Sequence, residues 1–243
     1  MEFSDFYTFL NTVSALNGLS HLIDEPKSRK LYFLMTHMLE VNKSMNLTAI
    51  KEEKGVIVRH FLDSLTVAAF LPENAKILDV GCGAGFPCLP LGVCRPDLEI
   101  TALDSTEKRI VYVRDTAKAL EIPHFTAIAA RAEELGHDNA FRERFDIVTA
   151  RAVAALPALA ELSLPFVRVG GRFIAMKAKK GEDELAAARA AIPKLGGTVR
   201  CVHAMTLAEG DIQDERLLIE IEKTSATPAA LPRAWGKILK KPL

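Results

Sequence analysis

Residues 77–86 read Ile77-Leu78-Asp79-Val80-Gly81-Cys82-Gly83-Ala84-Gly85-Phe86. An apolar run that ends in alternating glycines predicts a buried strand, a tight turn and a following helix. Glycine lets the backbone turn sharply and lets a ligand approach it closely. In an open α/β sheet such a turn lies in the crevice where the strand order reverses. The stretch therefore predicts a nucleotide-binding turn rather than a simple strand-to-helix connection.

The spacing of the glycines indicates which nucleotide this turn holds. The dinucleotide fingerprint is G-x-G-x-x-G, and its third glycine would fall at position 86, which is phenylalanine here. The chain has G-x-G-x-G instead, and Asp79 precedes it. A carboxylate beside the loop repels a pyrophosphate and attracts an ammonium group, which favours S-adenosylmethionine (SAM). The expected cofactor-binding residues of this stretch are Asp79, Gly81, Gly83 and Gly85.

Short apolar runs alternate with helical patterns on the C-terminal side of Pro72. This alternation predicts an α/β fold with a mostly parallel, doubly wound, Rossmann-like sheet. The glycine turn resembles that of class I SAM-dependent methyltransferases, so we expect the fold of that class. The last two runs follow each other closely and predict an antiparallel hairpin at the edge. The seven predicted strands are residues 76–80, 98–103, 125–129, 145–149, 171–176, 198–205 and 217–222.

Residues 1–72 have helical patterning instead, with predicted helices capped by Ser4, starting near Asp24 and running over 59–70. We expect an N-terminal helical cap over 1–72, a SAM-binding domain over 73–223 and a basic tail over 224–243. Five basic residues and no acidic residue lie from position 223 onward. Two interpretations stay open for this tail, a solvated terminus and a basic arm for phosphates. Its basic residues are Lys223, Arg233, Lys237, Lys240 and Lys241.

The composition excludes several classes of protein. Lysine plus arginine and aspartate plus glutamate both number 31, so a whole-chain basic field like that of a histone is absent. No apolar run approaches the ~18 residues of a membrane span, and the acidic N-terminus does not resemble a signal peptide. We expect a cytoplasmic protein. The four cysteines form no C-x-x-C pair, so we expect free thiols and no metal site.

Two further segments follow predicted strands and extend the expected cofactor site. Asp104 lies 23 positions after Gly81, close to where nucleotide-binding folds place the acidic residue that binds a ribose hydroxyl. The alternative for Asp104 is a helix cap, a role that the neighbouring Ser105 can also fill. After the next strand, the backbone of Ala132 and the carboxylate of Glu133 are candidates for the adenine edge; the alternative is a plain helix start.

Arg151 stands at the end of the fourth predicted strand, where the reacting centre is expected. Arginine cannot act as a base at neutral pH, but it can orient a carbonyl, a phosphate or a cofactor carboxylate. An ion pair at the rim of the sheet is the alternative. Neither an Asn/Asp-Pro-Pro-aromatic signature nor a cysteine occurs there. Such a site suits an acceptor that needs no base, such as guanine N7, whose lone pair attacks the methyl group directly.

Several separated motifs together resemble the family of bacterial small-subunit rRNA guanine-N7 methyltransferases, RsmG, once called glucose-inhibited division protein B. The resemblance covers nearly the whole chain, and the segment Arg59-His60-x-x-Asp63-Ser64 makes it specific. The other matching pieces are Asn46-Leu47-Thr48, 79–87 in the glycine turn, Leu103-Asp104-Ser105 with Lys108-Arg109, Arg131-Ala132-Glu133, Arg151-Ala152, and the ending from Pro232-Arg233 to Leu243.

The resemblance implies a cytoplasmic, SAM-dependent enzyme that methylates N7 of one guanine in the decoding-region loop of 16S rRNA. It implies cofactor contacts at Gly81, Phe86, Ala132, Glu133 and Arg151, with Asp104 on the ribose side and Ser105 beside it. Arg151 is then the expected catalytic residue, in a positioning role. The sequence departs from the family pattern at two places, with Ala178 after Lys177 and with Trp235 in the tail. Both departures concern the RNA contacts.

The RNA-binding residues are predicted less directly than the cofactor site. Guanine N7 is hidden in the deep major groove of A-form RNA, so the target base should lie in a loop or be flipped out. Each basic candidate has an ordinary solvated charge as its alternative. His60 is equally a packed histidine, and Asn46 and Thr48 are equally helix caps. The candidates are Asn46, Thr48, Arg59, His60, Lys177, Arg233, Lys240 and Lys241; Lys43, Arg109, Lys179 and Lys180 are further phosphate contacts to consider.

Three other functions remain open from the sequence. A nicotinamide-dependent oxidoreductase uses the same fold, although Phe86 counts against it. A SAM-binding ribosome-assembly factor would bind the cofactor without transferring its methyl group. A methyltransferase acting on another RNA or on a small molecule is the third. The partner expected here is 16S rRNA or the small ribosomal subunit, bound by a monomer without a metal ion.

Overall fold

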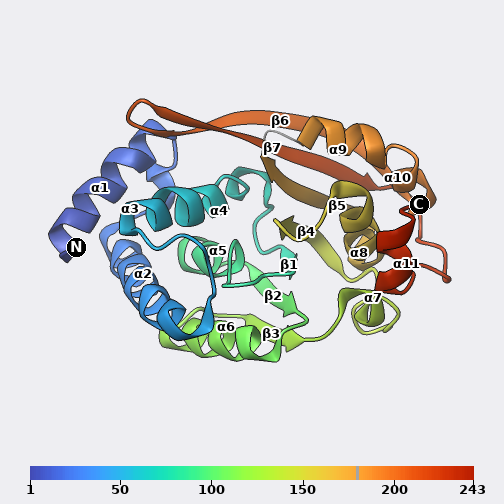
Figure 1. The fold of residues 1–243 in the computed structure, drawn as a ribbon, viewed down its shortest axis with the longest axis horizontal. Helices are drawn as coiled ribbons and strands as arrows, with labels where there is room; N and C mark the ends of the chain where they lie inside the picture. The colour runs from blue at the N-terminus through green and yellow to red at the C-terminus, as the bar shows by residue number, and fades with distance from the viewer. Residues whose placement is uncertain (179–180) are drawn as a thin grey trace.

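A computed structural model describes residues 1–178 and 181–243 and contains one seven-stranded sheet in the order β3-β2-β1-β4-β5-β7-β6 (Figure 1). β1 to β5 run parallel, and β7 pairs antiparallel with both β5 and β6. The predicted mixed sheet with an edge hairpin is therefore confirmed. The strands are β1 (Lys76–Val80), β2 (Glu99–Asp104), β3 (Phe125–Ala129), β4 (Phe145–Arg151), β5 (Val167–Ala178), β6 (Gly197–Glu209) and β7 (Ile212–Lys223).

Helices cover both faces of the sheet because the central strands are apolar on both sides. Side chains alternate between the two faces along each strand. Ile77 and Ile147 belong to one buried cluster, and Leu78 and Val148 belong to the other. The helices of the parallel half and of the C-terminal part are α5 (Cys88–Cys94), α6 (Glu107–Ala119), α7 (Ala132–Leu135), α8 (Leu156–Ser163), α9 (Gly181–Ala188), α10 (Ala191–Lys194) and α11 (Trp235–Lys240), with the short η4 (Leu164–Phe166).

The N-terminal helices pack on the face that also holds α5. Leu10 of α1 and Leu34 of α2 lie in the same buried cluster as Ile77 of β1 and Leu89 of α5. The hairpin of β6 and β7 reaches across to α1, where the Asn17 side chain exchanges two hydrogen bonds with the backbone of Ala208, at 2.8 and 2.9 Å (Figure 1). The elements of this region are α1 (Phe3–Leu16), η1 (Ser20–Leu22), α2 (Glu25–Met45), α3 (Glu53–Val56), η2 (Ile57–Leu62), α4 (Asp63–Leu65) and η3 (Ala68–Phe70).

The boundaries of two N-terminal helices differ from the prediction. α1 begins at Phe3, so Ser4 lies inside its first turn and caps nothing. Asp24 does cap α2, because its side chain accepts a hydrogen bond from the backbone N–H of Lys27 at 2.8 Å. The helix expected over 59–70 begins earlier, at Glu53, since Val56 and Ile57 are also buried against the core. A π-helical turn over Ile57–Leu62 makes up its middle.

The C-terminal tail packs onto the domain, so neither a frayed terminus nor a wholly free basic arm describes it. Lys223 is fully buried, and its ammonium group donates hydrogen bonds to the carbonyl of Leu164 and to Thr227 Oγ1, at 2.7 and 2.8 Å. Arg233 pairs with Glu161, which is also fully buried, at 2.6 Å. Within the described residues, no helix combines the length and apolarity that a membrane crossing needs.

Candidate functional site

The glycine turn between β1 and α5 requires its glycines for conformational and steric reasons. Gly81 and Gly85 have φ of +71° and +89°, in the region that side chains with a Cβ avoid. A Cβ at Gly81 would lie 2.5 Å from Val153 Cγ2, and one at Gly85 would lie 2.3 Å from Leu89 Cδ1. The turn therefore packs directly against the segment that follows β4. Its backbone stays close to the cavity beside it.

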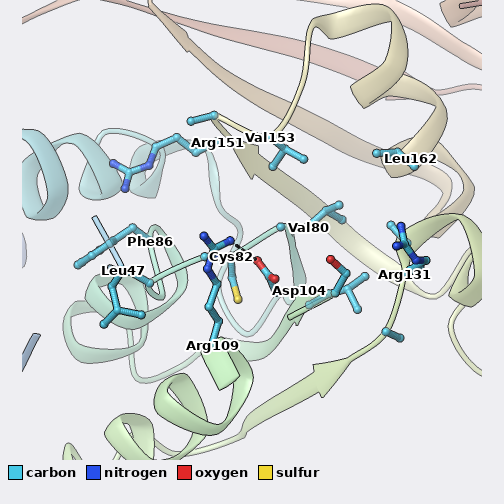
Figure 2. A pocket seen from close by; sticks show the side chains of 18 of the residues that line it. Leu47, Val80, Cys82, Phe86, Asp104, Arg109, Arg131, Arg151, Val153 and Leu162 are labelled. Atoms are coloured by element: carbon cyan, nitrogen blue, oxygen red, sulfur yellow. Dashed lines mark hydrogen bonds and ion pairs between the residues drawn. The ribbon is translucent and has the colours of Figure 1, made fainter. Parts of the chain in front are cut away.

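A cavity of about 440 Å³ opens at the carboxyl ends of β1, β2 and β4. Figure 2 shows side chains from the glycine turn, from the end of β2 and from the segment after β4 around it. This size lies within the ~300–1,000 Å³ typical of small-molecule sites. The predicted cofactor residues that line it are Gly81, Gly83, Phe86, Asp104, Ser105, Ala132, Glu133 and Arg151.

Asp104 both lines the cavity and holds the two loops that border it. Its Oδ2 accepts a hydrogen bond from the backbone N–H of Gly83 at 3.0 Å, and its Oδ1 accepts one from Thr106 at 2.8 Å. The side chain of Arg109 lies 3.8 Å from Oδ2 (Figure 2). The two interpretations of Asp104, cavity ligand and support for the start of α6, are thus compatible in one residue.

Asp79 and Gly85 do not line this cavity. Asp79 is 1% exposed, and its two carboxylate oxygens accept hydrogen bonds from the Cys88 backbone at 3.3 Å and from Thr149 Oγ1 at 3.2 Å. Burial raises the pKa of this carboxyl to about 6, although these hydrogen bonds oppose the shift. The structure thus places Asp79 behind the glycine turn rather than in direct contact with a ligand.

Arg151 connects the sheet to the N-terminal helices at the cavity wall. Its Nη1 donates hydrogen bonds to Asp63 Oδ2 at 2.8 Å and to the carbonyl of Arg59 at 3.1 Å. Its Nη2 donates to His60 Nδ1 at 3.2 Å. The guanidinium also lies 5.5 Å from the ring centre of Phe86. Arg151 is thus held at the cavity wall in an ion pair with Asp63, as the alternative interpretation expected, and its positioning role stays a prediction.

His60 is a packed side chain that nevertheless faces the cavity. Its ring stacks on Phe86 with the ring centres 4.3 Å apart, and its Nε2 lies 2.8 Å from Thr48 Oγ1. Burial, together with the charge of Arg151, lowers the pKa of His60 to about 3. The imidazole is therefore neutral across the physiological range. Two of the predicted RNA-binding residues, Thr48 and His60, thus line the expected cofactor cavity.

A second cavity, of about 590 Å³, adjoins the first one. The two share four lining residues, namely His60, Arg151, Ala152 and Val153. Arg59 and Lys177, both predicted to bind RNA, line the second cavity. The Lys177 side chain is only 7% exposed, and it pairs with Glu184 at 2.8 Å. Lys177 is therefore a fixed charge in the wall rather than a mobile surface cation.

Four of the RNA candidates, Asn46, Arg233, Lys240 and Lys241, line neither cavity, whereas Arg109 lines the first one. Asn46 is exposed and ends α2 in a left-handed conformation with φ of +49°, as a helix cap does. Arg233 is committed to its buried partner Glu161. Lys240 and Lys241 are exposed at the end of α11, where they are accessible to a phosphate. Lys179 and Lys180 lie outside the described residues.

Several residues that line the cavities carry no functional signal in the sequence. Val153, Leu162 and Trp235 border the first cavity, and Glu184 and Arg216 border the second. Trp235 stood out only as a departure from the family pattern. No local signal marks Arg216, because its partner Asp63 is 153 positions away in the sequence. Among the side chains described, no group of three or more His, Cys, Asp or Glu residues is arranged to hold a metal ion.

Comparison with known structures agrees with the fold. The crystal structure of M. jannaschii TYW2 in complex with AdoMet matches with a TM-score of 0.53 at 15% identity, covering 67% of this chain and 75% of that one. A structure of TrmN from Thermus thermophilus matches with a TM-score of 0.50 at 21% identity, covering 69% of this chain and 53% of that one. At such identities the likeness concerns the fold alone.

Comparison with known sequences reaches the level of a family. The GidB family model, described as rRNA small subunit methyltransferase G, matches residues 27–213. A relative from Staphylococcus carnosus, named ribosomal RNA small subunit methyltransferase G, is 47% identical over 85% of this chain and 86% of its own. One of the same name from Leuconostoc citreum is 39% identical over 95% of this chain and 97% of its own. The chain therefore belongs to the GidB family of rRNA small subunit methyltransferases.

Proposed function

We propose that this enzyme transfers a methyl group from SAM to N7 of one guanine in the decoding-region loop of 16S rRNA. The observation that carries the proposal is the pair of adjoining cavities, which share His60, Arg151, Ala152 and Val153. One cavity lies on the glycine turn at the point where the strand order reverses, where α/β folds bind nucleotides. The other offers a place for an acceptor beside it. The shared wall is then where the methyl group passes.

The residues of the first cavity suit the groups of SAM. Asp104 and Glu133 present carboxylates, which accept hydrogen bonds from ribose hydroxyls and from the adenine amino group. Arg151 can pair with the carboxylate of the amino-acid end, and the negative charge of Asp79, behind the turn, favours the ammonium group from a distance. When bound, SAM supplies an electrophilic methyl group on its sulfonium sulfur.

The chemistry of the shared wall favours an acceptor that loses no proton. His60 is the imidazole among the described lining residues, and its Nδ1 lone pair already accepts a hydrogen bond from Arg151. Its pKa of about 3 makes it a poor base at neutral pH. Guanine N7 has a free lone pair and needs no base. The chain then acts by alignment and electrostatics.

One variant in each cavity tests whether the first cavity binds SAM and the second binds the RNA. We expect Asp104→Ala to weaken SAM binding, measured by calorimetry, and Arg59→Ala to lower kcat/KM for the RNA by about tenfold or more without changing SAM affinity. Arg114→Ala is a matched control, because Arg114 is an exposed arginine on α6 whose ion pair, among the described residues, is with its neighbour Asp115. If Arg59→Ala behaves like Arg114→Ala, the second cavity does not receive the RNA.

Three alternatives predict different results in binding and methylation assays. An oxidoreductase would bind NAD(H), and Phe86 in place of the third fingerprint glycine disfavours that. A SAM-binding assembly factor would bind SAM and leave every RNA unlabelled. Methyl transfer to a small molecule or to another RNA would give label elsewhere than in 16S rRNA.

The proposal extends to the organisation of the chain. Residues 1–72 act as a helical cap that supplies Thr48, His60 and Asp63 to the site, residues 73–223 bind SAM, and residues 224–243 bring Lys240 and Lys241 toward the RNA. The proposed enzyme acts as a monomer. The enzyme works in the cytoplasm, on 16S rRNA or the small ribosomal subunit.

A further inference from the structure

A continuous chain of hydrogen bonds links three distant segments at the wall between the cavities. Arg216 Nε of β7 donates to Asp63 Oδ1 at 2.8 Å, and Arg151 Nη1 of β4 donates to Asp63 Oδ2 at 2.8 Å. Arg151 Nη2 reaches His60 Nδ1 at 3.2 Å, and His60 Nε2 reaches Thr48 Oγ1 at 2.8 Å. This hydrogen-bond network therefore runs from two partly buried ion pairs to one hydroxyl group.

The guanidinium of Arg151 fixes which atom donates and which accepts in the hydrogen bonds that follow it. A guanidinium only donates hydrogen bonds, so His60 Nδ1 must be the unprotonated, accepting nitrogen. In a neutral imidazole the other nitrogen then carries the proton, so His60 Nε2–H donates to Thr48 Oγ1. The backbone N–H of Ile50 donates to the same oxygen at 3.1 Å. Both lone pairs of the hydroxyl oxygen thus accept a hydrogen bond, so toward a ligand the Thr48 hydroxyl acts as a donor.

Thr48 is also held firmly in place. Its backbone N–H donates to Asn42 Oδ1 at 2.9 Å, and its carbonyl accepts from Asn42 Nδ2 at 3.0 Å. Asn42 is itself only 6% exposed. Thr48 lines the first cavity, and its partner His60 lines both. A hydrogen-bond donor of fixed position therefore lies in the first cavity next to His60, on the SAM side of the shared wall, toward which guanine N7 and its neighbouring group must point for methyl transfer.

The two purines differ in the group that lies next to N7. Guanine presents the O6 oxygen there, which accepts hydrogen bonds, whereas adenine presents the N6 amino group, which donates them. A fixed donor that faces this edge stabilises guanine and leaves adenine with two opposed donors. Such a site discriminates strongly against adenine, because binding adenine would leave buried hydrogen-bond donors without an acceptor.

We propose that the Thr48 hydroxyl donates a hydrogen bond to O6 of the target guanine, and that His60 and Arg151 are positioning residues that keep Thr48 a donor. This inference rests on the proposed function. In the reaction the N7 lone pair forms the new bond to carbon, the sulfur of SAM keeps the electron pair of the broken bond, and no proton leaves. The Thr48 hydrogen bond therefore selects and orients the base and takes no part in the transfer itself.

The test compares two bases at the target position of 16S rRNA assembled by ligation. One RNA carries guanine, and the other carries 2-aminopurine, which keeps N7 and lacks O6. For Thr48→Val, we expect the preference for guanine, as a ratio of kcat/KM values, to fall about three- to tenfold relative to the wild type, as the loss of one hydrogen bond implies. Thr48→Ser keeps the hydroxyl and should keep the wild-type ratio.

A second variant examines the positioning role without touching Thr48. His60→Phe keeps a ring stacked on Phe86 but removes the Nε2–H that orients the hydroxyl. We expect it to lose the same preference, and the double variant with Thr48→Val to lose no more than either single variant. A merely structural role of His60 would lower both rates together and leave their ratio unchanged, which overturns the proposal.

Two results with Thr48→Val contradict the inference directly. One is a guanine preference equal to that of the wild type. The other is a loss of SAM affinity as large as the loss of kcat/KM, because the hydroxyl would then serve the cofactor. Failure of the proposed function is a separate result, since the wild-type enzyme would then place no methyl group on N7 of either RNA.

Discussion

The carboxyl of Asp79 gives the sharpest prediction about stability. It is fully buried behind the glycine turn, and burial raises its pKa from 3.8 to about 6. In Asp79→Asn the amide can reproduce both contacts, because its oxygen accepts from the Cys88 N–H and its nitrogen donates to Thr149 Oγ1. The variant therefore removes the buried charge and leaves the hydrogen bonds. We expect it to be more stable than the wild type at neutral pH.

The magnitude follows from the difference between the two pKa values. Because the folded-state pKa is raised, the unfolded chain ionises first as the pH rises, and wild-type stability falls between about pH 4 and pH 6. At about 1.4 kcal/mol for each tenfold change in the equilibrium, the full cost of ionising Asp79 is about 3 kcal/mol. Between about pH 5 and pH 7.5 the advantage of Asp79→Asn should grow by about 1.4 kcal/mol.

Urea denaturation of both proteins without SAM, across this pH range, measures the difference. Asp97→Asn is a control of opposite sign, because hydrogen bonding to Arg95 lowers the pKa of Asp97 to about 2. Its loss of stability should stay nearly constant between about pH 5 and pH 7.5 and fade only as the pH falls from about 4 toward 2. An Asp79→Asn advantage that does not change with pH, or a variant less stable than the wild type at pH 7.5, would refute this account of the buried carboxyl.

Three further predictions concern binding. Gly81→Val should raise the SAM dissociation constant beyond detection by calorimetry, since even a Cβ would lie 2.5 Å from Val153, which lines both cavities; wild-type affinity would contradict the packing. Asp104→Ala should weaken SAM binding by about 1–3 kcal/mol in the same assay, and an unchanged affinity would remove Asp104 from the site. The double variant Lys240→Ala and Lys241→Ala should reduce the slope of log K for RNA binding against log salt concentration by about one to two. An unchanged slope would show that these lysines contact no phosphate.

The tail is tested through these two lysines because removing all residues after Lys223 would disturb the structure. Truncation leaves the buried Glu161 without Arg233 and takes Trp235 out of the first cavity. We therefore expect such a truncation to lower SAM affinity as well as RNA binding. The loss of one partner of a buried ion pair costs about 3–5 kcal/mol.

The sequence predicts the strands and the first cavity well because both depend on local signals. Buried strands are short apolar runs, and the glycine turn, Asp104 and Arg151 each follow such a run directly. In a parallel sheet these carboxyl ends meet at one edge, so neighbouring residues in space can be inferred from strand order. The helix boundaries near Ser4 and Glu53 were less accurate, because tertiary burial rather than capping chemistry sets them.

The environment of a charged side chain could not be predicted in the same way. Lys177 and Lys223 resemble surface cations in the sequence, yet both are buried and donate to carbonyl groups of other segments, those of Ala154 and Leu164. Arg216 carries no motif, and its role follows only from the docking of β7 beside Asp63. Such pairs depend on how the cap and the sheet fit together, which no local pattern encodes.

Methyl transfer itself tests the central claim most directly. Purified enzyme and SAM with a labelled methyl group would be incubated with small ribosomal subunits and with protein-free 16S rRNA, both from cells that lack this gene, and the RNA digested to nucleosides. We predict label in 7-methylguanosine from at least one of the two substrates. Label in another nucleoside, or bound SAM with no label in either RNA, would contradict the account.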